Sequence, residues 1–110
     1  MSFALSPYFR EAKPLAQRSV AAAGISATYA LVGTVFGEGV VAIILVSTLD
    51  QTVQLSFDGT TDFMPLVAGA TAVIDFKTNQ IALGGSRGIY VKEIGNPTTG
   101  SLYVSAIGVE

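Results

Sequence analysis

The 110-residue sequence contains no cysteine, no histidine and no tryptophan. Without cysteine and histidine, the chain has no disulfide bond, no thiolate nucleophile, no imidazole base and no zinc site built from these side chains. No serine has a histidine to serve as its base, and the Ser-x-x-Lys motif of some acylating enzymes is absent. We therefore expect a protein that is not an enzyme, with no catalytic residues, no cofactor and no metal ligands.

Charge is also scarce in this sequence. Only 13% of the residues are charged while 50% are hydrophobic, and the net charge is −2. This composition excludes a disordered tail and a coiled coil. It also lacks the basic surface by which proteins bind nucleic-acid phosphates, so we expect no nucleic-acid partner. The low charge predicts that some apolar surface packs against a partner rather than facing water.

Long hydrophobic runs are missing as well. The longest one, residues 40–46, has seven residues, whereas a membrane-spanning helix needs about 20. The N-terminus has no apolar signal-peptide core and is interrupted by Pro7. We expect a soluble chain with no membrane partner and no standard secretion signal.

What the sequence does contain is a β pattern. From Ser19 onward, glycines separate short runs rich in valine, isoleucine, threonine, tyrosine and phenylalanine. We predict an all-β protein, an antiparallel β-sandwich or jelly roll of about eight short strands in residues 19–110, with a small closed barrel as the competing architecture. The predicted strands are residues 19–23, 27–32, 40–47, 52–58, 62–67, 70–77, 88–94 and 101–107.

Three of these runs indicate which way their side chains point. Alternation places Val53, Leu55 and Phe57 on one face of their strand. The same alternation favours Ile74 and Phe76 as inward residues of theirs. Residues 40–47 are apolar on both faces, which predicts a central strand or one covered by another chain.

The turns are recognisable too. Asp58 and Gly59 predict a tight hairpin, with Asp58 bonding nearby backbone amides; a calcium site at Asp58, Asp62 and Asp75 is the disfavoured alternative. The segment Gly-Asn-Pro-Thr-Thr-Gly at residues 95–100 predicts that strands 88–94 and 101–107 pair with each other. That pairing would account for Tyr90 and Tyr103 by cross-strand packing.

Residues 1–18 differ from the rest of the chain, and we predict an extended N-terminal arm there. Their side chains include three basic residues and one acid, whereas the remaining chain carries three basic residues and seven acids. The arm either packs on its own domain or docks on another chain. In the second case, the predicted partner-binding residues are its large apolar and basic side chains: Phe3, Tyr8, Phe9, Arg10 and Arg18.

A series of short motifs covers residues 27–107. They are Ser-Phe-Asp-Gly-Thr, Ala-Gly-Ala, Asp-Phe, Ile-Tyr-Val-Lys and Pro-Thr-x-Gly-x-x-Tyr-Val-Ser, with Ser-Ala-Thr-Tyr-Ala-Leu-Val-Gly upstream. This series resembles small virion structural proteins of tailed bacteriophages, and most nearly capsid decoration proteins of the cement or staple type. The resemblance implies a non-enzymatic β-protein, made in the host cytoplasm, that lies on the capsid surface as a homo-oligomer, either a dimer or a trimer. There it would bridge subunits of the major capsid protein and stabilise the assembled capsid. Residues 1–19 have no counterpart in it.

Two further functions stay open at this point. The chain could be a tail, collar or fibre-base component that contacts other virion proteins. It could also be a carbohydrate-binding β-sandwich for host attachment, in which tyrosines such as Tyr90 and Tyr103 stack on sugars.

Overall fold

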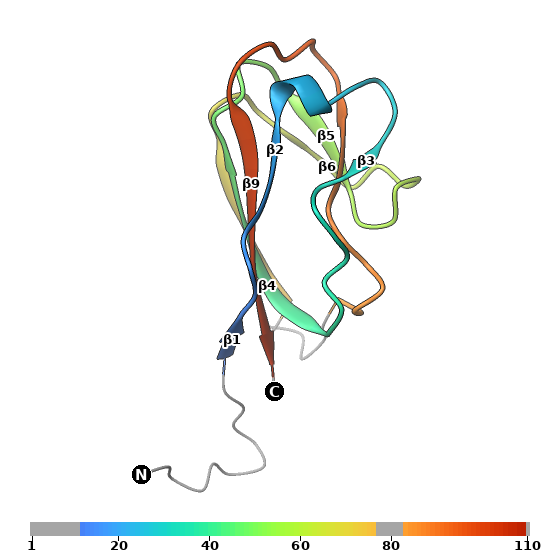
Figure 1. The fold of residues 1–110 in the computed structure, drawn as a ribbon, viewed down its shortest axis with the longest axis vertical. Coiled ribbons are helices and arrows are strands. Elements are labelled where there is room, and N and C mark those ends of the chain that lie inside the picture. The colour runs from blue at the N-terminus through green and yellow to red at the C-terminus, as the bar shows by residue number, and fades with distance from the viewer. Residues whose placement is uncertain (1–11, 77–82, 110) are drawn as a thin grey trace, which may run out of the picture.

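The computed structural model describes residues 12–76 and 83–109, and in this part it forms two antiparallel β-sheets without an α-helix (Figure 1). The predicted all-β fold is therefore confirmed. One sheet has five strands: β1 (Ala12–Pro14), β2 (Arg18–Ala21), β9 (Ser101–Val109), β4 (Val40–Ser47) and β7 (Thr71–Asp75). The other sheet has four: β3 (Ala30–Leu31), β8 (Tyr90–Glu93), β5 (Val53–Ser56) and β6 (Met64–Leu66).

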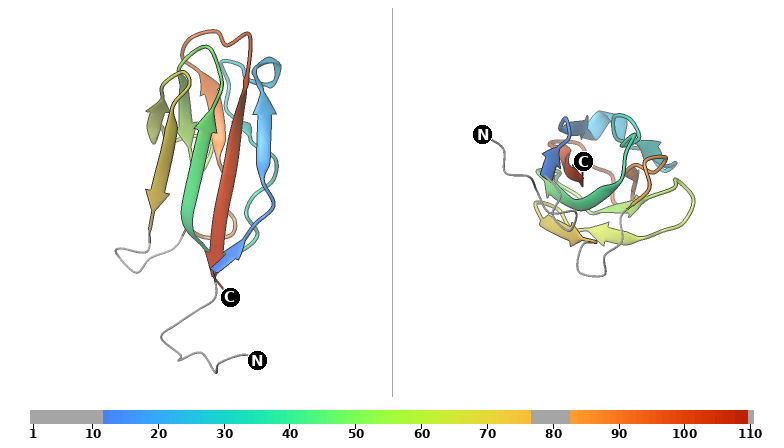
Figure 2. Two further views of the ribbon diagram at one scale, coloured as in Figure 1. Left: turned by 90° about the vertical axis from the view of Figure 1, so that its left-hand side faces the viewer. Right: turned by 90° about the horizontal axis from the view of Figure 1, so that it is seen from below.

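The strand order interleaves the two sheets. In the five-stranded sheet β9 pairs with β1 and β2 along one side and with β4 along the other, and β7 follows β4. The four-stranded sheet has the order β3-β8-β5-β6. From β2 onward, β5 and β6 are the one pair of consecutive strands that shares a sheet, and every other connection in the described chain crosses from one sheet to the other (Figure 2).

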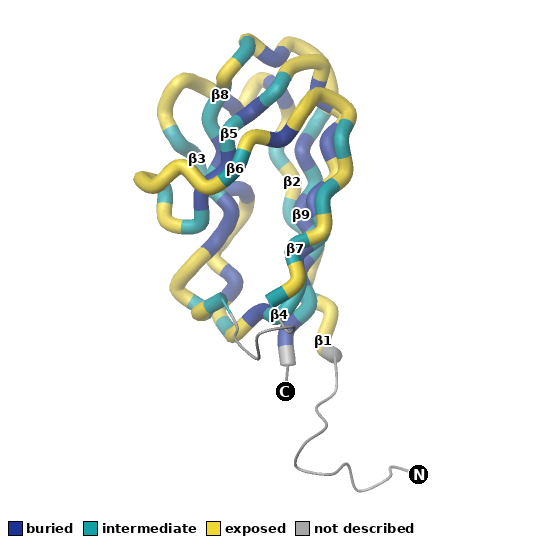
Figure 3. Tube along the Cα trace, turned by 180° about the vertical axis from the view of Figure 1, so that it is seen from behind, coloured by how far each residue is buried: buried dark blue, intermediate teal, exposed yellow. Residues whose placement is uncertain are grey.

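The hydrophobic core fills the space between the sheets (Figure 3). Ile43 and Leu45 of β4 are fully buried, and they lie opposite Ala106 and Val104 of β9. Across the core, the four-stranded sheet contributes residues such as Val53, which is also fully buried. Since β4 lies between β9 and β7, the prediction that residues 40–47 form a central strand is confirmed.

The predicted strand faces are also confirmed. Val53 and Leu55 are buried, and Phe57, just beyond the end of β5, is half-buried against the core. On β7 and after it, Ile74 and Phe76 pack on the core. Several predicted strands are longer than the observed ones, because residues at both ends of the predicted β3, β5 and β6 belong to turns.

The predicted pairing of residues 88–94 with 101–107 is wrong. β8 pairs with β3 and β5, whereas β9 lies in the other sheet and pairs with β1, β2 and β4. Tyr90 and Tyr103 therefore lie in different sheets, and cross-strand packing between them does not occur.

The physical reason lies in how the loop between β8 and β9 is held. The carboxylate of Asp50, in the loop between β4 and β5, accepts hydrogen bonds from the Thr98 backbone at 2.9 Å and from its hydroxyl at 2.7 Å. The Ser101 backbone donates to the Thr48 hydroxyl at 2.9 Å. Gly100, with φ of 88°, lies so close to Thr48 that a side chain would collide with its carbonyl. These contacts fix a crossing between the sheets where a hairpin was predicted.

The described part of the predicted arm belongs to the five-stranded sheet. Ala12 pairs with Val109, and Pro14 pairs with Ile107. The sheet thus begins at Ala12. The predicted boundary between the arm and the β-domain, between residues 18 and 19, falls at the start of β2. Residues 1–11 lie outside the described part.

Replacing Ile43 by alanine tests how much the core contacts of β4 contribute to the free energy of unfolding. Because Ile43 is fully buried, Ile43→Ala should lower the free energy of unfolding by about 2–5 kcal/mol in a urea titration. The control Ile94→Ala makes the same change at a residue that is 58% exposed, and it should cost only about 0.5 kcal/mol. Equal losses in the two variants would contradict this description of the core.

Candidate functional site

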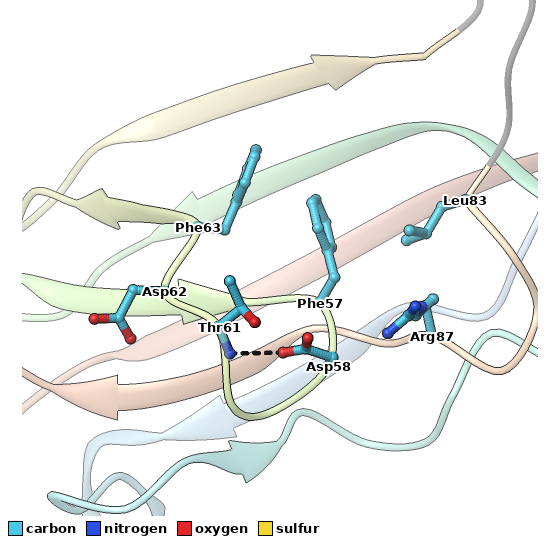
Figure 4. A pocket seen from close by; sticks show the side chains of 7 residues that line it. All are labelled: Phe57, Asp58, Thr61, Asp62, Phe63, Leu83 and Arg87. Carbon is cyan, nitrogen blue, oxygen red and sulfur yellow. Dashed lines mark hydrogen bonds between the residues drawn. The ribbon is translucent and has the colours of Figure 1, made fainter.

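A pocket of about 300 Å³ opens beside the turn that joins β5 to β6 (Figure 4). Figure 4 shows two phenylalanine rings along one side and an arginine opposite the turn. The residues that line it come from the turn and from the segment before β8: Phe57, Asp58, Thr61, Asp62, Phe63, Leu83 and Arg87.

The turn is built around two polar side chains. The Ser56 hydroxyl accepts the backbone N–H of Gly59 at 3.0 Å and donates to the Asp58 carboxylate at 2.8 Å. Asp58 Oδ1 also accepts the backbone N–H groups of Thr60 at 2.9 Å and Thr61 at 2.8 Å. The bonds from the Thr61 and Thr60 amides, followed by the Ser56 hydroxyl, hold the pKa of Asp58 far below its usual value. The prediction that Asp58 organises a hairpin turn is confirmed.

The apolar side of the pocket is an aromatic cluster. The rings of Phe57 and Phe63 lie 4.4 Å apart at an angle of 40°, and Phe57 lies 5.9 Å from Phe76, which follows β7. Both arrangements are tilted contacts of the kind that aromatic pairs favour. Phe63 is nevertheless 47% exposed, so one of its faces is available to a ligand or partner.

On the far side of Asp62, a charged network continues onto the four-stranded sheet. The Tyr29 hydroxyl donates to Asp62 at 2.5 Å, and Lys92 Nζ lies 3.3 Å from the same carboxylate and 4.7 Å from the Tyr29 ring. The Tyr29 hydrogen bond and then that of Lys92 lower the pKa of Asp62. Burial, followed by the hydrogen bond to Asp62 and the nearby negative charges, raises the pKa of Tyr29 to about 12.

The two carboxylates beside the pocket are engaged in local contacts. Asp58 is occupied by the turn and Asp62 by Tyr29 and Lys92, so both carboxylates already have hydrogen-bond donors. Among residues 12–76 and 83–109, no three acidic, histidine or cysteine side chains come together as a metal site would require. What the pocket offers is phenyl surface, the Leu83 side chain and the Arg87 guanidinium. Such a surface accommodates an apolar or aromatic side chain beside a hydrogen-bond acceptor.

Of the predicted partner-binding residues, the structure describes Arg18, and it places this side chain on its own fold. The guanidinium donates to the backbone carbonyls of Ala16 at 2.8 Å, Thr34 at 3.0 Å and Val35 at 3.2 Å. It also lies 4.9 Å from the centre of the buried Phe36 ring. These contacts join β2 to the segment after β3, which is a structural role within the chain.

The other four predicted anchors, Phe3, Tyr8, Phe9 and Arg10, lie outside the described residues. The two tyrosines considered for sugar stacking do not meet, because Tyr90 lies over Gly59 in one sheet and Tyr103 lies in the other.

Sequence reasoning missed the pocket. Phe63 was placed inside a strand of residues 62–67, but β6 begins only at Met64, so Phe63 remains in the turn and exposed. The available signal was the aspartate-rich turn itself, which is flanked by Phe57 and Phe63. Nothing in the local sequence indicated that Leu83 and Arg87 would be brought beside it.

Comparison of the chain with protein-family models, with curated protein sequences and with solved structures found no match. The resemblance to phage structural proteins therefore rests on the sequence motifs. In the part of the chain that the structure describes, no helix has the length and apolarity needed to cross a membrane.

The hydrogen bonds at Asp58 predict a dependence of stability on pH. Because the folded state lowers this pKa, the ionised carboxylate stabilises the fold above its unfolded pKa of about 4, and this stabilisation is lost as the pH falls below that value. Asp58→Asn keeps an acceptor oxygen but removes the charge. The loss of unfolding free energy between pH 6 and pH 2.5 should therefore be smaller in this variant than in the wild type. Identical pH profiles would contradict the assignment.

The hydrogen bond of Tyr29 predicts a late tyrosine ionisation. In an ultraviolet absorbance titration, the wild-type protein should show a phenolate step near pH 12, provided that circular dichroism shows the fold intact there. Tyr29→Phe should remove this step. A wild-type titration without a late step would show that Tyr29 does not donate to Asp62.

Proposed function

We propose that the protein is a non-enzymatic structural protein of a tailed-bacteriophage virion. It is made in the host cytoplasm, lies on the capsid surface and stabilises the assembled capsid by bridging neighbouring subunits of the major capsid protein. The motifs at residues 27–107 supply the resemblance on which this proposal rests. The docking character of the pocket, with its exposed Phe63 and occupied carboxylates, is compatible with it.

We further propose that the fold is a jelly roll. The orders β2-β9-β4-β7 and β3-β8-β5-β6, with nearly every connection crossing between the sheets, are those expected of eight strands wound as two Greek keys. Such a body is a rigid spacer, because each sheet closes over one shared core. A rigid body of this kind suits a protein that holds other subunits at a fixed separation.

A second observation that supports the proposed role is the place where the first strand begins. Ala12 of β1 lies beside Val109 at the end of β9, so the chain enters the body at one tip, as Figure 1 shows. The eleven preceding residues, which include Phe3, Tyr8, Phe9 and Arg10, could span about 36 Å if extended. A partner that takes up this segment would be bound both by the segment and by the rigid body.

Such a protein stabilises the capsid only if it binds the assembled shell more tightly than the free subunits. A ligand that binds the assembled lattice and not the free subunits stabilises the lattice by mass action. Many modest contacts on one closed shell then act together.

Rebinding to stripped capsids tests this role. Capsids freed of the protein should lose resistance to heat, and adding back the full-length chain should restore it. Because the N-terminal anchors are proposed to grip the coat, the variant Phe3→Ala/Tyr8→Ala/Phe9→Ala should bind stripped capsids about tenfold more weakly or worse. The control Val67→Ala/Ile94→Ala alters exposed residues of the body and should bind like the wild type.

Capsids that are equally heat-resistant with and without the protein would overturn the stabilising role. The location has its own readout, which is immunogold labelling of whole particles. Label over the whole shell supports decoration, whereas label at a single vertex would assign the protein to the tail or collar.

A further inference from the structure

The outward side of the five-stranded sheet is a broad surface with an unusual composition. In the left view of Figure 2, β7, β4, β9 and β2 lie side by side on this side of the molecule. Alternation along the strands turns Ile43, Leu45 and Val104 into the core and their neighbours outward. We call the following outward residues the outer face: Ile44, Val46, Val73, Tyr103, Ser105 and Ile107.

The outer face is continuous across three strands. Ile44 of β4 is in register with Val73 on one side and with Ser105 on the other, and Val46 is in register with Tyr103. Val73 is 67% exposed and Val46 is 37% exposed. Apolar and aromatic side chains thus come together on three strands, with Ser105 among them, where a sheet that faces water would carry mostly polar residues.

Charge is directed away from this surface. Lys13 and Arg18 belong to strands of the same sheet, but they lie opposite Gly108 and Val104, which face the other way. Lys13 forms an ion pair with Glu38 at 3.2 Å, and Arg18 binds the segment after β3. Among the described residues of these strands, Asp75 is the one charged residue at an outward position, and it lies at the end of the edge strand β7.

The dimensions of the face match what a stable pair of subunits needs. The outward side of the whole sheet has four strand positions, because β2 lies beside the three strands of the outer face. At about 4.8 Å spacing they give a width of about 19 Å, and the eight residues of β4 give a length of about 27 Å. Two such sheet sides would together cover about 1,000 Å² before side-chain relief is added, which is about the minimum area expected of a specific interface. A second copy supplies an equally flat and uncharged surface, and two sheets pack face to face at about 10 Å.

We propose that the outer face is the surface through which two copies of this chain associate, sheet against sheet, about a two-fold axis. Such an interface is isologous, so each copy covers the other's Val46 and Val73. Asp75, at the edge of the sheet, then lies in the polar rim that surrounds an apolar interface centre. This proposal does not depend on the capsid role, because the pairing is a property of the isolated protein.

Sedimentation velocity of the full-length chain over a range of concentrations tests the pairing. The wild type should sediment as a pair. Val73→Asp places a charge within the proposed interface and should weaken association about tenfold or more. Val67→Asp makes the same change at a residue that is 61% exposed and lies outside the outer face, and it should leave the association unchanged. A wild type that stays monomeric, or equal weakening in both variants, would overturn the proposal.

Site-specific cross-linking gives a readout that does not depend on the aspartate variants folding. Because the chain has no cysteine, Ser105→Cys introduces a single thiol in the centre of the outer face. A short bismaleimide should convert this variant to covalent dimers in high yield. The control Val67→Cys should give few covalent dimers, because residue 67 lies outside the outer face. Comparable yields of covalent dimer from the two variants would contradict the proposed interface. Neither result bears on capsid binding, so failure here leaves the capsid proposal standing.

Discussion

The packing of β4 between β9 and β7 is the constraint on which the rest of the structure depends. Ile43 and Leu45 lie fully buried on its inner side, while the outer side carries Ile44 and Val46 in place of polar residues. The inner side joins the five-stranded sheet to the core that it shares with the four-stranded sheet. The outer side leaves apolar area uncovered in the single chain. One strand therefore explains both the stability of the body and its proposed need for a partner.

Three aspartates in the described loops each hold local structure. Asp58 holds the turn after β5, Asp50 holds the crossing into β9, and Asp62 joins Tyr29 to Lys92. The energetic role of these carboxylates is to satisfy backbone and side-chain donors that would otherwise lack partners. These three carboxylates therefore contribute to the fold.

Local sequence patterns correctly predicted the features that depend on interactions between residues close in sequence. The β class, the central position of residues 40–47, the inward side of Ile74 and the turn at Asp58 all follow from alternation or from turn chemistry, and the structure has them. The partner of each strand is decided by contacts distant in sequence. The crossing after β8 depends on Asp50 and Thr48, some fifty residues earlier. The sequence of the turn alone does not predict that contact. The pocket was missed for the same reason, since the fold brings Leu83 and Arg87 beside it. The contacts of Arg18 with the carbonyls of Thr34 and Val35 are equally distant in sequence.

The central claim is that this chain works as a fixed structural element between other subunits. A cryo-electron microscopy map of the assembled particle tests it most directly. The account predicts β-sandwich density on the outside of the shell, copies paired through the outer faces of their five-stranded sheets, and N-terminal segments that run from β1 into contact with coat subunits. A shell without such density, with the protein found as isolated monomers away from the particle, would contradict it.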